Sequence, residues 1–351
     1  MATTTEVRTL TLNQAINEAI RLEMRRDPNV IIMGEDVAGG AGRAAQGILD
    51  GWTPAMNSRG LIGEFGPERV IDTPISEMGF VGAGVGAAMT GLRPIVDLTF
   101  IDLVGCAYDQ IANQATKMHY MMGGKVDVPL TIRMSYGSRG GGGQTYGGGA
   151  AAQHSQTLYA ILAHIPGLKV VVPTTAYNAK GLLIAAIRDD GPVIFLDHKF
   201  LGASARAEVP SDPYTIPIGK AEVVRRGTDV TLCGIGRMTH MCLEAAEQLA
   251  SDGVDAEVID VLTLAPLDET TIVESVKRTR RLVVVDEDTP TCSMARDIAA
   301  RVADKGFDYL DAPVKTLTAP ETPVPFSAVL EAQYVPHAPD VVRVVRELFG
   351  R

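Results

Sequence analysis

Residues 72–80 have the sequence Asp-Thr-Pro-Ile-Ser-Glu-Met-Gly-Phe and follow a short apolar strand expected at Arg69–Ile71. A Gly- and Ala-rich helix opens across this stretch and places Glu77 at its mouth. An acid there either meets the helix dipole, as many first-turn acids do, or is positioned to hydrogen-bond a cofactor. The stretch therefore predicts a strand-to-helix turn that carries an acid, and it leaves the role of the acid open.

On both sides of this turn, apolar β-branched strands alternate with helical segments. The strands are expected at Val30–Glu35, Pro94–Phe100, Val128–Met134, Leu168–Pro173 and Pro192–Asp197. The helices are expected at Leu12–Arg26, Asp102–Met121, Gln156–Leu162 and Ala176–Arg188. This alternation predicts a mostly parallel sheet that is covered by helices on both faces.

A Pro-containing segment of weak periodicity, Gly202–Pro217, interrupts this pattern. The alternation then resumes, with strands expected to begin at Val230, Ala256, Leu282 and Val314 and helices at His240, Glu269, Ser293 and Asp340. We therefore expect an α/β protein with two doubly wound domains. The first spans 1–201, a linker spans 202–217, and a second, smaller domain spans 218–351.

The chain has 351 residues, of which 46% are apolar, and this is enough to fill two cores. Its net charge of −10 describes an acidic protein and argues against a nucleic-acid partner. The start has no signal-peptide pattern, and the longest stretch of low charge, Met78–Leu92, is too short and too rich in glycine to span a bilayer. The cysteines form no CxxC pair, which favours free thiols in a reducing compartment. A cytoplasmic globular protein without a membrane partner is expected.

The expected helix contains the run GAGVGA at residues 82–87, which fits the relaxed dinucleotide-binding pattern G-x-G-x-x-[GA]. That pattern requires a strand directly before its first glycine, whereas Pro74–Val81 intervenes here and already belongs to the helix opening. A nicotinamide-dependent Rossmann enzyme is therefore disfavoured. The spacing of Gly79, Gly82 and Gly86 instead leaves one helix face bare, which predicts close packing against a partner.

Eight blocks of this sequence resemble, in the same order, the beta subunits of thiamine-diphosphate-dependent dehydrogenases in the transketolase superfamily. They are GEDVAGGA at 34–41, DTPISEMGF at 72–80, TGLRPIVDLTF at 90–100, DQIANQATKMHYMMGGK at 109–125, AAAQHSQTLY at 150–159, HIPGLKVVVP at 164–173, AKGLLIAAIRDDGPVIF at 179–195 and LDAPVKTLTAPETPVPFSAVLE at 310–331. Acetoin dehydrogenase is the most similar branch, pyruvate dehydrogenase the next, and branched-chain 2-oxo acid dehydrogenase is more distant. The resemblance implies a pyrimidine-binding domain followed by a transketolase C-terminal domain.

The resemblance implies that Glu77 hydrogen-bonds the pyrimidine of thiamine diphosphate and favours the tautomer that accepts the thiazolium proton. The alternative is a merely structural acid. Glu35 and Leu103 are also implied to contact the cofactor. Leu103 stands where relatives often carry phenylalanine, so the resemblance supports an apolar contact there and not aromatic stacking.

His154 lies at a loop-to-helix junction, where a histidine beside a cofactor can shuttle protons near neutral pH. The resemblance implies that it helps transfer the acyl unit to a lipoyl arm, whereas the alternative is a helix-capping neighbourhood with Ser155 as the cap. The glycine-rich stretch Gly137–Gly149 before it looks like an insertion relative to the family. It is either flexible filler or a mobile lid in which Arg139 and Tyr146 are the working side chains.

The resemblance implies two metal ions. A structural potassium ion in some relatives suggests a main-chain site at Leu130, Ala186, Ile187, Asp189 and Gly191, although a plain helix C-terminus explains this segment nearly as well. The superfamily holds magnesium and diphosphate with Gly-Asp-Gly and a later Asn, and this sequence has no Gly-Asp-Gly. The resemblance therefore implies a separate alpha subunit that supplies this half of the site, an alpha2-beta2 heterotetramer, and a lipoyl-bearing acyltransferase as its partner.

The implied reaction cleaves acetoin, releases acetaldehyde and transfers the hydroxyethyl unit oxidatively to lipoamide, giving acetyl-CoA. Pyruvate dehydrogenase is the alternative, and branched-chain 2-oxo acid dehydrogenase is a more remote one. A non-catalytic scaffold subunit is the alternative from another class, and the presence of both Glu77 and His154 argues against it. The sequence leaves open the native substrate, the alpha partner, the role of the insertion and the binding of potassium.

Overall fold

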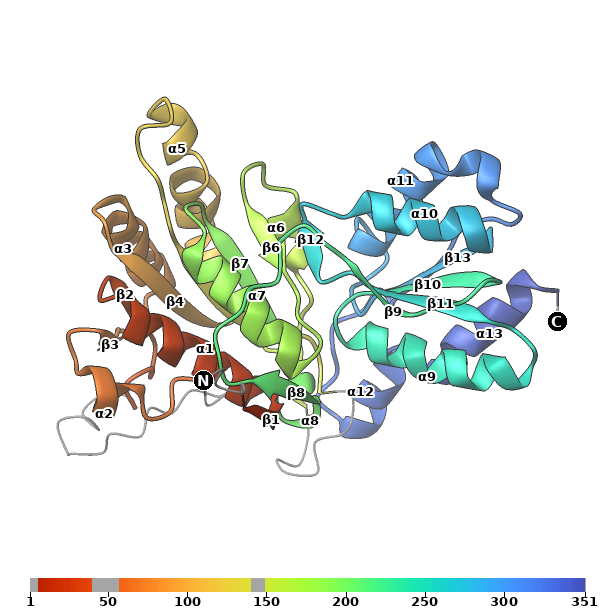
Figure 1. Cartoon of the computed structure of the whole chain (residues 1–351), viewed down its shortest axis with the longest axis horizontal. Coiled ribbons are helices and arrows are strands. Elements are labelled where there is room, and N and C mark those ends of the chain that lie inside the picture. The colour runs from red at the N-terminus through yellow and green to blue at the C-terminus, as the bar shows by residue number, and fades with distance from the viewer. Residues whose placement is uncertain (1–5, 40–56, 140–148, 351) are drawn as a thin grey trace, which may run out of the picture. The chain divides into compact units, whose positions relative to one another are not determined.

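The computed structural model describes residues 6–39, 57–139 and 149–350 (Figure 1). The chain divides into two compact units, which are described separately. The first contains Met1–Tyr136 and Ile161–Ile218, and the second contains Gly137–Ala160 and Gly219–Arg351. Tyr146, one of the two side chains expected in a lid, lies outside the described residues.

The first unit is built on a parallel sheet with the strand order β6-β7-β5-β4-β2-β3. Its strands are β2 (Val30–Gly34), β3 (Val70–Asp72), β4 (Arg93–Phe100), β5 (Thr131–Tyr136), β6 (Lys169–Val171) and β7 (Val193–His198). The central strands are buried along nearly their whole length. Continuous apolar strands of this kind are typical of a parallel sheet that is covered on both faces, as the sequence predicts.

Two helices of the first unit, α1 (Leu12–Arg26) and α7 (Ala176–Arg188), pack against each other and have the bounds expected from the sequence (Figure 1). Each begins at a capping box, formed by Thr11 with Gln14 in α1 and by Thr175 with Asn178 in α7. A capping box satisfies backbone donors that the first helical turn leaves open, so it fixes where a helix starts.

The prediction of one continuous helix at Asp102–Met121 is wrong. The chain there forms the short elements η2 (Ile101–Leu103), α4 (Val104–Asp109), η3 (Gln110–Ala115) and α5 (Met118–Met121). η3 is a π-helical turn, and the amide of Thr116 donates to the carbonyl of Ile111, five residues back. Hydrophobic periodicity does not reveal such a widened turn, because it inserts a single residue into an otherwise helical pattern.

The segment expected as a linker, 202–217, forms part of the first unit. It contains β8 (Arg206–Pro210), which pairs antiparallel with β1 (Val7–Thr11), and it follows the short helix α8 (Leu201–Ser204). Two further helices of this unit are α2 (Leu61–Phe65) and α3 (Glu77–Met89). The helix α6 (Tyr159–Ala163) lies where the chain passes from the second unit back to the first.

The second unit contains a sheet with the strand order β14-β13-β10-β11-β9, in which β9 runs antiparallel to β11 and the pairs β11 with β10, β10 with β13 and β13 with β14 run parallel. Its strands are β9 (Glu222–Arg225), β10 (Val230–Gly234), β11 (Ala256–Asp260), β13 (Leu282–Val285) and β14 (Lys315–Leu317), and a short strand β12 (Thr263–Ala265) follows β11. Its helices are α9 (Arg237–Ser251), α10 (Glu269–Thr279), α11 (Met294–Lys305), η4 (Phe307–Tyr309), α12 (Ala328–Tyr334) and α13 (Ala338–Leu348). Apolar side chains of α9 and α13 form one buried core with those of the sheet.

The early segment 137–160 is tied into this second unit by hydrogen bonds to acids. The amide of Ser138 donates to Glu287 at 2.6 Å, and the amide of Arg139 donates to Glu331 at 2.8 Å. The buried hydroxyl of Tyr159 donates to Asp286. Within the parts of the chain that the structure describes, no helix has the length and apolar character needed to cross a membrane.

Candidate cofactor site

Three neighbouring strands of the first unit, β4, β2 and β3, end at one edge of the sheet (Figure 1). Glu35 directly follows β2, Glu77 follows β3 as the first residue of α3, and Leu103 ends η2 just after β4. Ligands of open parallel sheets bind at this carboxyl edge of the strands. The three residues expected to contact a cofactor therefore come from adjacent strand ends of one unit.

The turn that carries Glu77 is tied to the end of β2. The amide of Thr73 donates to the carbonyl of Gly34 at 3.1 Å, and the Asp72 carboxylate accepts the amide of Ala38 at 2.5 Å. Glu77 itself is half-buried at the N-terminus of α3. The predicted strand-to-helix turn with an acid at the helix mouth is thus confirmed.

Glu35 lies within electrostatic range of Glu77. Burial raises the pKa of Glu35, and the nearby charges of Asp36 and Glu77 raise it further. A carboxyl group with a raised pKa keeps its proton to a higher pH than an ordinary glutamate does, which suits it to proton exchange. Glu35 therefore contributes a second titratable group beside Glu77.

The same edge offers polar and apolar surface side by side. The Thr73 hydroxyl oxygen is buried and has no hydrogen-bond partner within the described residues. Ile75 and Met78, on either side of Glu77, are 75% and 59% exposed, and Leu103 is half-buried. A buried hydroxyl without a partner is costly unless a ligand satisfies it, so this edge suits an apolar ring that carries polar atoms.

α3 is held against the sheet by Gly84. A Cβ atom there would lie 2.5 Å from Cγ2 of the buried Val96 in β4. Of the glycines expected on a bare face, Gly82 lies against the side chain of Gln110, whereas a Cβ atom at Gly86 would have no other atom within 4 Å. Close packing of Gly86 against a partner remains a prediction.

A cluster of buried charges within the sheet was missed by sequence reasoning. Arg133 of β5 contacts Asp97 of β4 and Asp197 of β7, and each of the three side chains is at most 2% exposed. The sequence does contain a signal, because each of the three apolar strands carries a charged residue in its interior. A buried charge is expensive unless paired, so such charges usually meet one another.

His154 belongs to the second unit, whereas Glu77, Glu35 and Leu103 belong to the first. His154 is exposed in a turn, and its amide donates to the carbonyl of Ala151 at 3.2 Å. Ser155 is not a helix cap, because α6 begins only at Tyr159. The capping interpretation of this stretch is therefore wrong, and the implied role of His154 in acyl transfer remains a prediction.

A pocket of about 340 Å³ lies beside the His154 turn within the second unit. Its lining includes Gln156, Thr157, Asp288, Thr289 and Tyr334. Burial raises the pKa of Asp288 to about 8, with the charge of Asp286 as the second cause. This pocket therefore contains a carboxyl group that is largely protonated at neutral pH.

Four of the five carbonyl oxygens expected to bind potassium have partners in the chain. The guanidinium of Arg93 donates to the carbonyl of Ile187 at 2.8 Å and to that of Asp189 at 2.6 Å. The carbonyl of Leu130 accepts the amide of Val193, and that of Ala186 accepts the amide of Asp189. A cationic group thus already contacts two of the expected carbonyls, and a potassium ion would share them with Arg93.

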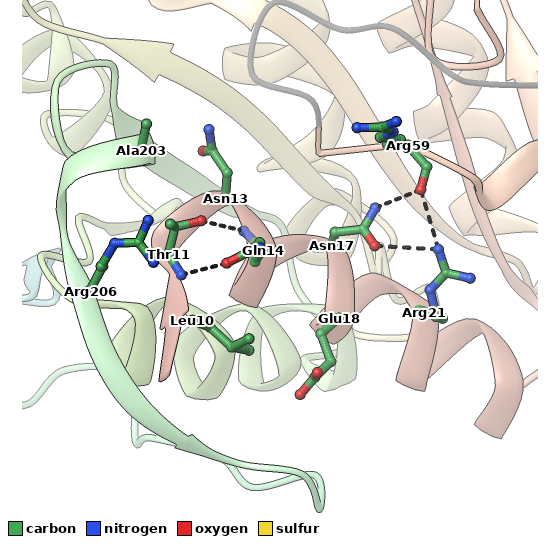
Figure 2. A pocket seen from close by; sticks show the side chains of 10 residues that line it. All are labelled: Leu10, Thr11, Asn13, Gln14, Asn17, Glu18, Arg21, Arg59, Ala203 and Arg206. Carbon is green, nitrogen blue, oxygen red and sulfur yellow. Dashed lines mark hydrogen bonds between the residues drawn. The ribbon is translucent and has the colours of Figure 1, made fainter. Parts of the chain in front are cut away.

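A further pocket, of about 550 Å³, lies in the first unit between α1 and the start of β8. Figure 2 shows Arg59 and Arg206 on its rim, with Asn13 and Asn17 of α1 between them. None of the three residues expected to contact a cofactor lines it. The pocket is therefore separate from the carboxyl edge that carries Glu77.

The chain matches two family models, "Transketolase, pyrimidine binding domain" over residues 8–203 and "Transketolase, C-terminal domain" over residues 219–341. It is 52% identical to the acetoin:2,6-dichlorophenolindophenol oxidoreductase subunit beta of Bacillus subtilis (strain 168), over 98% of each chain. The identity is 50% to the subunit of the same name from Cupriavidus necator, over 97% of each chain. It is 45% to the pyruvate dehydrogenase E1 component subunit beta of Rhizobium meliloti (strain 1021), over 97% of this chain and 70% of that one.

Among solved structures, the chain is similar to "Split gene transketolase, inactive beta4 tetramer", with a TM-score of 0.75 and 22% identity over 97% of this chain and 98% of that one. That likeness concerns the fold alone. Together with the two domain matches, it defines a protein of the transketolase fold class.

The identities over the whole chain narrow the class further. This chain belongs to the family of beta subunits of the thiamine-diphosphate-dependent acetoin and pyruvate dehydrogenases. The family and the α/β fold expected from the sequence are both confirmed.

Proposed function

We propose that this chain is the beta subunit of an enzyme that cleaves acetoin, releases acetaldehyde and passes the remaining two-carbon unit oxidatively to lipoamide of an acyltransferase, giving acetyl-CoA. The observation that carries this proposal is the identity of 52% and 50% to two acetoin oxidoreductase beta subunits over nearly the whole chain. The pyruvate dehydrogenase subunit reaches 45%. Pyruvate is therefore the alternative substrate.

The carboxyl edge of the first unit fits the pyrimidine half of thiamine diphosphate. Glu77 supplies a carboxyl group for a ring nitrogen, the buried hydroxyl of Thr73 supplies a polar group that still needs a partner, and Leu103 supplies apolar contact. When bound, the cofactor provides an electron sink that allows cleavage of a carbon–carbon bond next to a carbonyl.

The acids of this edge would govern the proton on the pyrimidine. The backbone that carries Glu77 is fixed by the first turn of α3 and by the hydrogen bonds of Thr73 to Gly34 and of Asp72 to Ala38. Glu35, whose pKa is raised by burial and by the charges of Asp36 and Glu77, can exchange a proton near this residue. An acceptor on a fixed backbone beside an exchangeable proton is what a proton-transfer site requires.

We assign the remaining functions of the enzyme to two partner proteins, an alpha subunit and an acyltransferase. The absence of Gly-Asp-Gly from the sequence supports an alpha subunit that holds magnesium and the diphosphate. We therefore propose a cytoplasmic alpha2-beta2 heterotetramer in which His154 serves the lipoyl arm of the acyltransferase. A potassium ion at the turn contacted by Arg93 remains part of this proposal, and the lone chain is expected to be inactive.

Co-expression with the alpha subunit tests the proposal. The complex should reduce a dye in a thiamine-diphosphate-dependent manner, with acetoin preferred over pyruvate and 3-methyl-2-oxobutanoate. Preference for pyruvate would assign the chain to the alternative branch. No activity with any of the three substrates would refute the proposed function.

Glu77→Gln separates an enzyme subunit from a scaffold. The substitution keeps the size of the side chain but removes the ionisable group, so turnover of the complex should fall by about 10²- to 10⁴-fold. Glu68→Gln is the matched control, because Glu68 is exposed just before β3. Unchanged turnover in the Glu77 variant would support the scaffold.

A further inference from the structure

The strand β4 ends in a bulge at Thr99. Asp97 pairs with Arg133 of β5, but Phe100 pairs with Ser135, so β4 contains one extra residue between these two pairs. Thr99 lies in this extra stretch with a φ of +64°. A β-branched residue in the left-handed region is strained and persists only where its surroundings enforce it.

The carboxylate of Asp97 provides this enforcement. Its Oδ1 accepts the amide of Thr99 at 3.0 Å, two residues along the chain, which closes a turn around the strained residue. Asp97 is itself fixed on both sides. Arg133 donates to both of its oxygens, at 3.1 and 3.0 Å, and a Cβ atom at Gly34 of β2 would lie 2.3 Å from the Asp97 carbonyl oxygen.

The positive charge of Arg133 is balanced by a single carboxylate, so charge balance alone does not require Asp97. Arg133 already makes a bidentate pair with Asp197, at 2.6 and 2.7 Å, and also donates to Ser135. Burial acts to lower the pKa of Arg133, but the charges of Asp197 and Asp97 outweigh this effect and raise it. The cluster therefore contains one guanidinium and two carboxylates, and a second buried carboxylate is costly unless it makes hydrogen bonds that nothing else supplies. The hydrogen bond to Thr99 is such a bond.

The chain after the bulge is anchored a second time. The ammonium of Lys199 lies 4.4 Å from the centre of the Phe100 ring and 3.7 Å from the carboxylate of Asp102. Leu103 follows directly and ends η2. The segment 98–103 is thus held at its start by Asp97 and near its end by Lys199.

We propose that Asp97 is a positioning residue, whose carboxylate holds the strained bulge at Thr99 and so presents segment 98–103 to the pyrimidine of the cofactor. This inference rests on the proposed function. The proposed role differs from a general role in stability, because the cofactor affinity depends on one specific hydrogen bond, the one that the Thr99 amide donates to Asp97.

The test compares Asp97→Ala, Asp97→Asn, Thr99→Gly and the double variant Asp97→Ala with Thr99→Gly, each in complex with the alpha subunit. The first readout is the thiamine diphosphate concentration that half-saturates the complex, measured by calorimetric titration. The second is hydrogen–deuterium exchange of peptides that cover residues 98–103. The control is Asp260→Ala, which removes a similarly buried strand acid from the second unit.

Asp97→Ala should raise the half-saturating concentration by about 10- to 100-fold, because the strain at Thr99 is no longer held, and segment 98–103 should exchange faster. Asp97→Asn keeps Oδ1 for the Thr99 amide, although its NH2 group replaces the Oδ2 that accepts from Arg133, and it should lose clearly less affinity than Asp97→Ala. Glycine adopts the left-handed region without strain. Adding Thr99→Gly to Asp97→Ala should therefore restore most of the affinity that Asp97→Ala alone loses. The control Asp260→Ala should leave the cofactor titration unchanged.

Three binding results would overturn the inference. They are an Asp97→Ala complex with unchanged affinity, an Asp97→Asn complex as weak as the Asp97→Ala complex, and a double variant without recovery. If Asp97→Ala does not fold, the double variant must fold, and an unfolded double variant also overturns the inference. Failure of the proposed function is a separate result, because it is measured in the parent complex, which would then turn over none of the three substrates.

Discussion

Adding a single methyl group at two glycines of α3 should have unequal effects on the stability of the chain. Gly84 is buried, and a Cβ atom there would lie 2.5 Å from Cγ2 of Val96 and 3.4 Å from Cδ1 of Leu130. Gly86 is exposed, and a Cβ atom there would have no other atom within 4 Å. Both residues lie inside the same helix, so Gly84→Ala and Gly86→Ala change helix propensity by the same amount.

The magnitude follows from two terms. Alanine stabilises a helix interior by about 0.5–1 kcal/mol relative to glycine, and both variants gain this. Gly84→Ala also forces a methyl group into a buried valine that has few rotamers available, and such overpacking costs about 1–3 kcal/mol. The helix term cancels in the comparison, so Gly84→Ala should be about 1–3 kcal/mol less stable than Gly86→Ala.

Thermal unfolding of the isolated beta chain measures this difference. About 1–3 kcal/mol corresponds to about 2–12 °C in Tm for a domain of this size, with Gly86→Ala above the parent protein and Gly84→Ala below Gly86→Ala. Equal Tm values for the two variants would refute the close approach of α3 to β4. A third measurement, the affinity of Gly86→Ala for the alpha subunit, tests whether the open face packs against a partner, because a methyl group should then weaken assembly.

Two further predictions concern the buried acids of the second unit. Burial is the main cause that raises the pKa of Asp288 to about 8. In the unfolded chain this acid loses its proton near its ordinary pKa of about 4. The folded protein is therefore stabilised by this proton at low pH and loses that stability as the pH rises from about 4 to about 8. Asp288→Asn should remove this fall, so its Tm should exceed that of the parent increasingly up to about pH 8, and a constant difference across the range would contradict the assignment. Tyr159→Phe removes the hydroxyl that donates to Asp286, whose pKa burial already raises, and should cost about 1–3 kcal/mol at neutral pH and less near pH 5, where more of this acid is protonated. Urea unfolding at both pH values tests this against the exposed Tyr177→Phe as control, and a pH-independent loss would contradict it.

Elements specified by local signals could be predicted closely from the sequence. The helices Leu12–Arg26 and Ala176–Arg188 have their expected bounds because each starts at a capping box that is visible in the sequence. The buried parallel strands were predictable because short β-branched apolar runs between helices are typical of strands in a parallel sheet. The position of Glu77 at the mouth of α3 was predictable for the same reason, although its role came from family resemblance.

Features that depend on distant residues could not be predicted. The pairing of β1 with β8 joins segments about two hundred residues apart, as at Val7 and Pro210, and neither segment has a strong strand pattern. The charges of Asp97 and Arg133 were visible, but only the strand order of the sheet brings them together. The left-handed Thr99 was hidden as well, because nothing in its own side chain favours that backbone conformation.

The division of the chain into units determines how this protein can be cut and recombined. The polypeptide passes between the units three times, after Tyr136, after Ala160 and after Ile218. A fragment that ends at residue 218 would keep the stretch 137–160 but lose Glu287 and Asp286, the acids that bind Ser138 and Tyr159. A chimera that exchanges only the C-terminal half with a relative would join this stretch to foreign partners. An exchangeable C-terminal module must therefore carry residues 137–160 with it, so His154 would move with the C-terminal module and Glu77 would stay behind.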